Sequence, residues 1–287
     1  MYKTLEGLLR RFGNDYLEIE KLSVNESSEI YIVQNVSSEI YTLKLYKKEF
    51  SEKKFAKQIE IYTRLGQLES PYFLKYISNS KDEFIAREKY IVLELVEKGD
   101  LMDCLLSAKL FSPKLTKIIV WKLIHGINQM HSRGIVHRKI SIEKIFLDKF
   151  YNLKIAGFDH SKIVKEGQIN LFKYDIFDLG MMIIQLLTGK PNMKIIRDKI
   201  KLATQKGNFE SFWNILEAQG LYDFTPELKD LVTQMLSGKI ADITKLLSHD
   251  WFATLRNITQ NEFELYEQFM KNELRRYEVD ENEENIV

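Results

Sequence analysis

The residues that could do chemistry lie in three short stretches near the middle of the chain and at one lysine upstream. His137-Arg138-Lys139 comes first, Lys144 follows, and Gly157-Phe158-Asp159 comes directly after a short apolar stretch; Lys44 lies in an alternating apolar segment far upstream. Ammonium groups attract anions and donate hydrogen bonds, but they supply no oxygen ligand for Mg²⁺. Residues of these types therefore predict a site that attracts anions and repels divalent metal ions.

These residues must be held by elements that change character along the chain. Residues 16–46 and 73–96 are rich in β-branched and aromatic side chains, which predicts strands, and residues 50–65 between them show helical spacing. Beyond this part helical spacing dominates, and residues 175–188 are apolar on nearly every face, which predicts a helix buried in the domain centre. We therefore expect an α+β protein with a small β-rich lobe, a larger helical lobe and a junction near residues 96–99.

The composition of the 287 residues is that of a globular protein. Apolar residues make up 45 % and charged residues 29 %, and the net charge is +1, so a general electrostatic footprint for nucleic acid is absent. Cys104 is the single cysteine, which excludes an internal disulfide, and the longest apolar stretch, residues 181–187, is too short for a membrane span. The N-terminus lacks a secretory signal, so we expect a cytoplasmic protein with no nucleic-acid and no membrane partner.

The order of the short motifs in this frame resembles that of the protein kinase superfamily. Each motif is weak alone, but the ordered set spans about residues 16–252. The resemblance implies a two-lobed kinase-like fold, with an antiparallel-sheet lobe that carries one main helix over residues 16–96 and a mostly helical lobe over residues 99–252. Within this superfamily, the motifs most resemble those of the calcium/calmodulin-dependent group. The matching stretches are residues 41–44 (the lysine strand), 90–101 (the hinge), 131–138 (the approach to the catalytic loop), 153–159 (the strand and metal loop), 174–180 (the buried central helix) and 223–252 (the last helices).

The positions that carry catalysis in that family depart from its pattern. Lys139 stands at the catalytic aspartate, Lys144 at the metal-binding asparagine, Gly157 at the metal-holding aspartate and Gln58 at the glutamate that pairs with the nucleotide lysine. The phosphate loop, matched by residues 23–30, has no glycine, and the segment between Asp159 and Asp175 is too short for the family's activation loop. These departures predict a pseudokinase, which is not an enzyme and acts as a scaffold, an adaptor or an allosteric component of an assembly.

Two alternatives remain open. The first is a metal-independent nucleotide or anion sensor, in which residues aligned with the family's nucleotide site would bind the ligand: Lys44, Thr42, Leu93, Glu94, Val96 and Phe146. Lys44 is otherwise a strand lysine exposed to solvent. The second is an atypical active serine/threonine kinase that uses Asp159. No cofactor and no metal ion are predicted, apart from ATP bound without Mg²⁺.

The packing positions of the family are present. The resemblance puts His137, Phe158, Tyr62 and Tyr76 in the stacked apolar column of the kinase fold. Asp175 fits the position that accepts hydrogen bonds from the backbone of the catalytic loop. For His137 and Asp175 we therefore expect a structural role.

The two ends of the chain extend past the family match. Leu5, Leu8, Leu9 and Phe12 predict a short amphipathic helix within residues 1–15. Residues 253–277 predict a second amphipathic helix, which either packs on the large lobe or binds a protein partner, and residues 278–287 are an acidic tail that is solvated or docks on a partner. A protein partner at either end is therefore expected, with its identity open.

Overall fold

The structure is a computed structural model, and it describes residues 10–80, 88–165, 167–190, 192–218 and 224–277. Two compact units divide the chain, residues 1–97 and residues 98–287. Each unit is described separately below. Among the described residues, no helix combines the length and the apolar character that crossing a bilayer requires.

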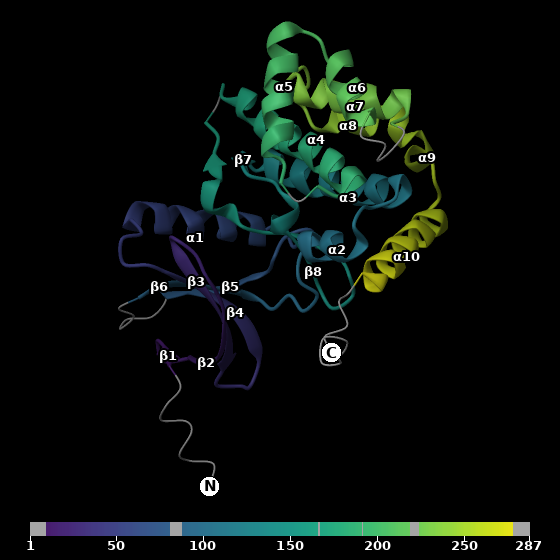
Figure 1. Cartoon of the computed structure of the whole chain (residues 1–287). Helices are drawn as coiled ribbons and strands as arrows, with labels where there is room; N and C mark the ends of the chain where they lie inside the picture. Colours follow the sequence, from purple (N-terminus) through teal and green to yellow (C-terminus); the bar gives the residue numbers. More distant parts are fainter. Residues whose placement is uncertain (1–9, 81–87, 166, 191, 219–223, 278–287) are drawn as a thin grey trace, which may run out of the picture. The chain divides into compact units, whose positions relative to one another are not determined.

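The described residues of the first unit form an antiparallel sheet and helix α1 (Glu52–Gly66) (Figure 1). The strand order of the sheet is β1-β2-β3-β4-β6-β5. The strands are β1 (Arg11–Phe12), β2 (Tyr16–Val24), β3 (Ser28–Asn35), β4 (Ile40–Tyr46), β5 (Tyr76–Asn79) and β6 (Lys89–Glu94). Alternation along β3 buries Tyr31 and Val33, which pack with Phe12, Leu43 and Val92 in the core of the sheet. This confirms the strands predicted within residues 16–46 and 73–96.

The helix predicted at the N-terminus does not extend to its last apolar residue. Arg11 and Phe12 form strand β1, which pairs with Tyr16 and Leu17 of β2, and the Phe12 side chain is fully buried. The Phe12 ring packs against Tyr31 with ring centroids 4.9 Å apart. Pairing with β2 and burial in the sheet core outweigh the helical spacing of this short segment. Residues 1–9, with Leu5, Leu8 and Leu9, lie outside the described residues.

Helix α1 (Glu52–Gly66) follows the sheet strand β4 and begins with a cap. The Ser51 side chain accepts a hydrogen bond from the Lys54 N–H, which satisfies one of the free donors at the helix N-terminus. Phe55, Ile61 and Leu65 recur at helical spacing and are buried. The helix predicted over residues 50–65 is therefore confirmed.

The second unit is mostly helical and is built around two long helices. Helix α3 (Pro113–Ser132) begins at the Ser112 cap with proline at its first position, and α4 (Lys173–Thr188) is buried along most of its length. The other helices are α2 (Leu101–Ala108), α5 (Lys194–Lys206), α6 (Glu210–Glu217), α7 (Pro226–Leu236), α8 (Thr244–Leu247), α9 (Ala253–Arg256) and α10 (Gln260–Arg276).

Short strands and 3₁₀ turns occupy the segment between α3 and α4. β7 (Ile135–Val136) pairs with β10 (Lys162–Ile163), and β8 (Ile145–Leu147) pairs with β9 (Leu153–Ile155), in both cases antiparallel. The 3₁₀ turns η2 (Ile142–Lys144), η3 (Phe158–His160) and η4 (Ile169–Phe172) connect them to α4. All the charged residues that the sequence singled out between 137 and 159 lie in this segment.

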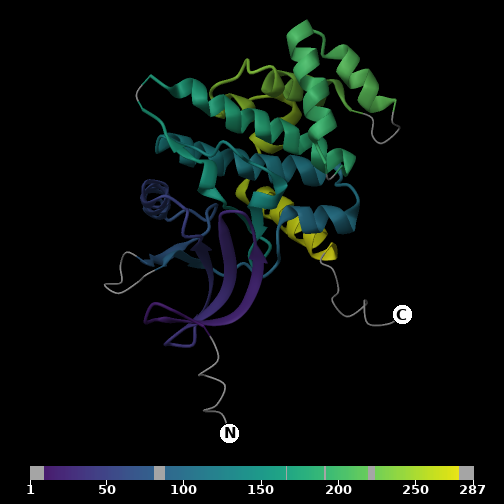
Figure 2. The same ribbon diagram turned by 60° about the vertical axis from the view of Figure 1, so that its left-hand side comes forward.

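Helix α10 packs on α3 (Figure 2). Met270 and Leu274 on its apolar face are buried, and Tyr277 at its end stacks on Phe111 with ring centroids 5.5 Å apart. An ion pair between Lys122 and Glu267 joins the two helices. Of the two roles expected for this helix, the described residues show packing on its own unit.

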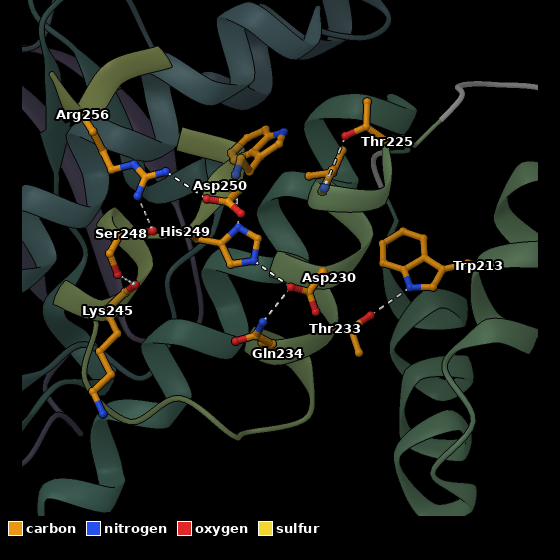
Figure 3. Close-up of polar contacts among 12 residues, drawn as sticks. Trp213, Thr225, Asp230, Thr233, Gln234, Lys245, Ser248, His249, Asp250 and Arg256 are labelled. Carbon is orange, nitrogen blue, oxygen red and sulfur yellow. Dashed lines mark hydrogen bonds and ion pairs between the residues drawn. The ribbon is translucent and has the colours of Figure 1, made fainter. Parts of the chain in front are cut away.

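A polar cluster joins α7 to the turn that follows α8, η5 (Asp250–Phe252) (Figure 3). His249 accepts the Trp251 N–H at Nδ1, and its Nε2 lies 3.0 Å from Asp230 on α7. Arg256 donates to the Ser248 carbonyl oxygen and pairs with Asp250 at 3.0 Å. The Trp251 N–H and the Ser248 carbonyl oxygen thereby have side-chain partners, and the contact of His249 with Asp230 ties this turn to α7.

Candidate active site

Asp175 holds the backbone of the loop that follows β7. Its fully buried carboxylate accepts the N–H groups of His137 at 2.9 Å and Arg138 at 2.7 Å. His131 at the end of α3 lies 2.8 Å from the same carboxylate through Nε2, and its ring stacks on Phe172. One side chain from α4 thus fixes α3 and the loop at residues 137–140 relative to each other.

A second aspartate of α4 extends this support. Asp178 accepts the Ile140 N–H at 3.1 Å and pairs with Arg197 of α5 at 3.1 Å. Burial raises the pKa of Asp178 to about 6, against the lowering effect of Arg197. Asp178 is not among the site residues that the sequence predicts. Its signal was a second acid three residues after Asp175, on the same face of a helix that is otherwise apolar.

Lys144 and Gly157 fit together as a pair. Gly157 has φ +76°, and a Cβ added to it would lie 2.4 Å from Cδ of Lys144 and 3.3 Å from its Nζ. The two segments are also joined by the Ala156 N–H, which donates to the Lys144 carbonyl oxygen at 2.9 Å. The lysine side chain therefore occupies the space where any side chain at position 157 would begin.

His137 and Phe158 form the packed base of the same region. The His137 ring is fully buried, its Nε2 lies 2.9 Å from the Ala156 carbonyl oxygen, and its centroid is 5.2 Å from that of Phe158. Burial lowers the pKa of His137, so the ring is neutral and donates through Nε2. A neutral, fully buried imidazole in this setting packs and positions the loop.

The charged side chains at the surface of this region are mostly cations. Arg138 and Lys139 are exposed, while Lys144 and Asp159 are half-buried. The pKa of His160 is lowered, first by burial and then by the neighbouring cations Lys139, Arg138 and Lys144, with Asp159 opposing them. These four charged groups therefore lie within electrostatic range of one another, and their balance is positive.

The residues of this region do not fit Mg²⁺. Lysines stand at 139 and 144, and the Lys144 side chain fills the space beside Gly157. Within the described ranges, no three His, Cys, Asp or Glu side chains come together in a way that could hold a metal ion. Oxygen ligands are what Mg²⁺ requires, and this segment presents ammonium groups instead.

Most residues aligned with the nucleotide site lie in the first unit. Lys44 in β4 lies between Ile30 and Ile91 of the adjacent strands, and only 9 % of its surface is exposed, so the expectation of a solvent-exposed strand lysine is wrong. Its Nζ lies 5.1 Å from the centroid of the Tyr46 ring. Gln58 of α1 is also buried.

The segment aligned with the hinge ends the first unit. Leu93 is buried in β6 opposite Thr42 of β4, and the Oγ1 atom of Thr42 is buried with no hydrogen-bond partner among the described residues. The Glu94 N–H donates to the Lys75 carbonyl oxygen at 2.9 Å, so this donor is already used within the sheet. Val96 is half-buried just after the strand.

Two expected groupings are split between the units. Phe146 belongs to β8 of the second unit, where it bridges to Asp100, while the other five residues of the predicted nucleotide site belong to the first. The predicted aromatic column is divided in the same way. Tyr62 and Tyr76 stack in the first unit with centroids 5.9 Å apart, and His137 contacts Phe158 in the second.

Comparison with known families gives a match over residues 16–173, to the protein kinase domain family. Among curated proteins, the chain is 27 % identical over 217 residues to the cell cycle serine/threonine-protein kinase CDC5/MSD2 of Saccharomyces cerevisiae, covering 66 % of this chain and 30 % of that protein. It is 25 % identical over 278 residues to a probable CDC5 homolog of Encephalitozoon cuniculi, covering 84 % and 55 %. It is 25 % identical over 289 residues to the serine/threonine-protein kinase AtPK1/AtPK6 of Arabidopsis thaliana, covering 87 % and 59 %.

These comparisons correct the functional prediction. The matched relatives are named serine/threonine protein kinases, which contradicts the prediction of an inactive pseudokinase that works as a scaffold or adaptor and is not an enzyme. They also give no special weight to the calcium/calmodulin-dependent group. The chain spans less than two thirds of the length of each of these relatives.

Proposed function

Because this chain belongs to the protein kinase domain family, we propose that it transfers a phosphoryl group from ATP to serine or threonine hydroxyls of a protein substrate. The observation that carries the proposal is the buried Asp175 carboxylate, which holds the backbone N–H groups of His137 and Arg138. A loop fixed in this way can present side chains to a substrate without the cost of ordering them during the reaction.

Electrostatic stabilisation is the main demand of this chemistry. Phosphoryl transfer proceeds through a loose transition state whose charge is spread over the transferred oxygens, and the protein mainly positions and neutralises it. Lys139 and Lys144 supply positive charge in this segment, and neither depends on a metal ion. We assign to them the stabilisation of phosphate oxygens, while the nucleotide role of Lys44 in the first unit stays a prediction from the sequence.

Asp159 is the carboxylate that we assign to the acceptor hydroxyl. It lies in the turn η3, two residues after Gly157, and is half-buried among the cations described above. The acceptor oxygen forms the new bond to phosphorus as the bond to the leaving ADP oxygen breaks, and Asp159 accepts the hydroxyl proton. A positioned general base of this kind contributes roughly 10²–10⁴-fold to a rate.

The test is an assay of radiolabelled phosphate transfer to a degenerate serine/threonine peptide library. The purified chain is assayed with Mg²⁺ and with EDTA, beside Lys44→Ala and Asp159→Asn variants prepared in the same way. We expect phosphate transfer to persist in EDTA and to be at least 100-fold slower in Asp159→Asn. In Lys44→Ala, we expect half-maximal transfer to need a higher ATP concentration. Transfer in neither condition, or equal transfer by Asp159→Asn, contradicts the proposal.

Three expectations from the sequence stay predictions. They are placement in the calcium/calmodulin-dependent group, a cytoplasmic location, and a protein partner at residues 1–15 or 253–287. Because the apolar face of α10 is packed on α3, a partner that needed that face would have to displace the helix. The acidic segment 278–287 lies outside the described residues and keeps its expected role as a docking or solvated end.

A further inference from the structure

The last turn of α10 is anchored on the second unit at two points. Leu274 is fully buried, and the Tyr277 ring stacks on the fully buried Phe111 ring with centroids 5.5 Å apart. The Tyr277 N–H donates to the Leu274 carbonyl oxygen at 3.1 Å, which closes the turn. Between these anchors, Cζ of the exposed Arg275 lies 5.3 Å from the centroid of the Tyr151 ring. The end of α10 therefore contacts the turn between β8 and β9.

Tyr151 has an unfavourable backbone conformation in this turn. Its φ of +61° lies in the left-handed region, which glycine and asparagine adopt more readily than a bulky residue does. Asp148 closes the turn, because its carbonyl oxygen accepts the Tyr151 N–H at 2.8 Å and its side chain accepts the N–H groups of Phe150 and Asn152. Tyr151 is only 3 % exposed. Since a strained residue persists only where surrounding contacts hold it, the contacts of this ring must offset the strain.

The Tyr151 ring joins three segments that are far apart in the sequence. Besides Arg275, it contacts Lys98, the first residue of the second unit, whose Nζ lies 5.7 Å from the same centroid. The Lys98 N–H donates to the Leu147 carbonyl oxygen of β8 at 3.2 Å, and the Leu147 N–H donates to the Gly99 carbonyl oxygen at 3.0 Å. Aromatic rings attract cations, so both contacts favour the observed position of the turn. The start of the unit, the β8–β9 hairpin and the end of α10 thus meet at one ring.

The same hairpin carries the fitted pair of the candidate site at its other end. β8 begins directly after Lys144, and β9 ends two residues before Gly157. The two strands are joined by three residue pairs, which span about 10 Å from the turn to the site. A two-stranded ladder of this length is not stable alone. The position of Lys144 therefore depends on what holds the hairpin, and the turn at Tyr151 is one of its supports.

We propose that Arg275 is a positioning residue, which holds the β8–β9 hairpin through the Tyr151 ring and thereby sets Lys144 against Gly157. Its consequence for phosphate transfer rests on the proposed function, which assigns phosphate oxygens to Lys144. Helix α10 lies beyond residues 16–173, the part matched to the kinase domain family, so this support comes from outside the matched segment. Docking of the last turn of α10 holds the hairpin, and displacement of that turn loosens Lys144.

Amide hydrogen exchange tests this coupling without catalysis. The full chain is labelled with ¹⁵N at alanine, and exchange is followed at the Ala156 N–H, which donates to the Lys144 carbonyl oxygen. Ala203 of α5 is the internal reference in the same spectra. We expect Arg275→Gln to speed exchange at Ala156 by roughly threefold to tenfold, the effect of losing one cation–π contact, and to leave exchange at Ala203 unchanged.

Matched variants separate this contact from a general effect on α10. Arg276→Gln removes the neighbouring cation of the same turn, which pairs with Glu273 of α10 itself, and should change exchange at Ala156 by less than about 1.5-fold. Arg275→Lys keeps a cation for the ring and should restore most of the protection that Arg275→Gln loses.

A second substitution at the ring tests whether the two residues act through each other. Tyr151→Asn keeps a residue that tolerates the left-handed region but removes the ring, so it should speed exchange at Ala156 at least as much as Arg275→Gln does. Adding Arg275→Gln to Tyr151→Asn should then cause no further change, because both substitutions remove the same contact.

The outcomes distinguish the role of Arg275 from the proposed function. Unchanged exchange at Ala156 in Arg275→Gln, an equal rise in Arg276→Gln, or additive effects of Arg275→Gln and Tyr151→Asn overturns the positioning role. In the phosphate-transfer assay, Arg275→Gln should be at least roughly threefold slower than the parent, and Arg275→Lys should recover the rate. Coupled exchange without phosphate transfer by any of these proteins supports the positioning role and overturns the kinase proposal. Equal transfer by Arg275→Gln and the parent supports the kinase proposal and overturns the positioning role.

Discussion

At the scale of single residues, the site depends on substitutions that fit one another. Lys144 needs the space that Gly157 leaves, since a Cβ at 157 would lie 2.4 Å from Cδ of the lysine. Asp178 needs both the Ile140 N–H and Arg197, because an uncompensated buried carboxylate costs several kcal/mol. Each pair is a local arrangement that a single substitution breaks.

The Lys144–Gly157 fit predicts a coupled loss of stability. Gly157→Ala introduces both a strained φ and a clash with Lys144, whereas Gly207→Ala at φ +63° meets nothing within 4 Å. We expect Gly207→Ala to cost about 1 kcal/mol and Gly157→Ala about 1–3 kcal/mol more. In urea unfolding, combining Gly157→Ala with Lys144→Ala should remove most of the extra cost of Gly157→Ala over Gly207→Ala. An extra cost that Lys144→Ala leaves unchanged contradicts the fit.

Asp178 predicts a pH dependence of stability. Because burial raises its pKa from about 3.8 unfolded to about 6 folded, the native state holds the proton more tightly. The free energy of unfolding therefore falls as pH rises from about 4 to about 6, by up to about 3 kcal/mol from this group. Asp178→Asn, which keeps an acceptor for the Ile140 N–H, should lack this part of the slope.

The measurement is urea unfolding from pH 4 to 7 for the parent, Asp178→Asn and the exposed control Asp198→Asn. Asp100, whose pKa is raised to about 6 by burial and by Asp103, contributes the same slope in all three proteins. The difference between parent and Asp178→Asn thus isolates one group. Parallel curves for these two proteins would show that Asp178 is not protonated in this range.

At the scale of elements, helices α3, α4 and α10 together support the loop after β7. α4 supplies Asp175 and Asp178 to the loop after β7, and α10 covers α3 from the other end of the sequence. α10 begins with a capping box in which Thr259 and Glu262 satisfy each other's backbone N–H groups. Its docking is therefore specified by its own cap and by its buried face.

Truncation on the two faces of α10 should have very different costs. Met270→Ala and Leu274→Ala each leave a cavity against α3 and should lower the free energy of unfolding by about 2–4 kcal/mol. Leu265→Ala on the same helix, at 71 % exposure, should change it by less than about 0.5 kcal/mol. Thermal unfolding of the three variants checks this, and equal small effects would mean that α10 does not pack on α3 in solution.

At the scale of the whole molecule, the chain is nearly neutral but its charge is uneven. The net charge of +1 combines a basic helix α5 with an acidic C-terminal segment. Lys144 stands at the metal-binding asparagine of the family's pattern and Gly157 at its metal-holding aspartate, so under the proposed function the nucleotide phosphates meet fixed positive charge instead of a bound divalent ion. Nucleotide binding of this kind needs no metal ion, unlike the metal-dependent binding usual in the family. The difference is measured on the intact chain.

Nucleotide should stabilise the whole chain without a metal ion. At a concentration 100 times its Kd, ATP that binds only the native state adds about 2.7 kcal/mol, which raises the melting temperature by several degrees. We expect equal shifts with Mg²⁺ and with EDTA, a lost shift in Lys44→Ala, and an unchanged shift in the surface control Lys48→Ala. A shift that required Mg²⁺ would contradict the role given to Lys139 and Lys144.

The sequence by itself determined which segments of the chain form strands and which form helices. Alternating apolar residues placed the strands of the first unit, helical spacing placed α1, α3 and α10, and the ordered motifs indicated the kinase fold, because these signals are local and repeat over many residues. It misjudged the first strand, since Phe12 pairs and packs with residues from other strands. Its prediction of an inactive pseudokinase is contradicted by the relatives, which are named serine/threonine protein kinases, since missing residue types do not show what a site does with those that remain.

Only the tertiary structure decided which distant residues meet. The pairing of Asp178 with Ile140 and Arg197, the passage of Lys144 over Gly157 and the burial of Lys44 all join segments that no local spacing connects. The same holds for a cavity of about 310 Å³ that the loop after β7, α4 and α5 enclose. Burial, and with it the charge a group can carry, is a property of packing, and packing is set by the whole fold.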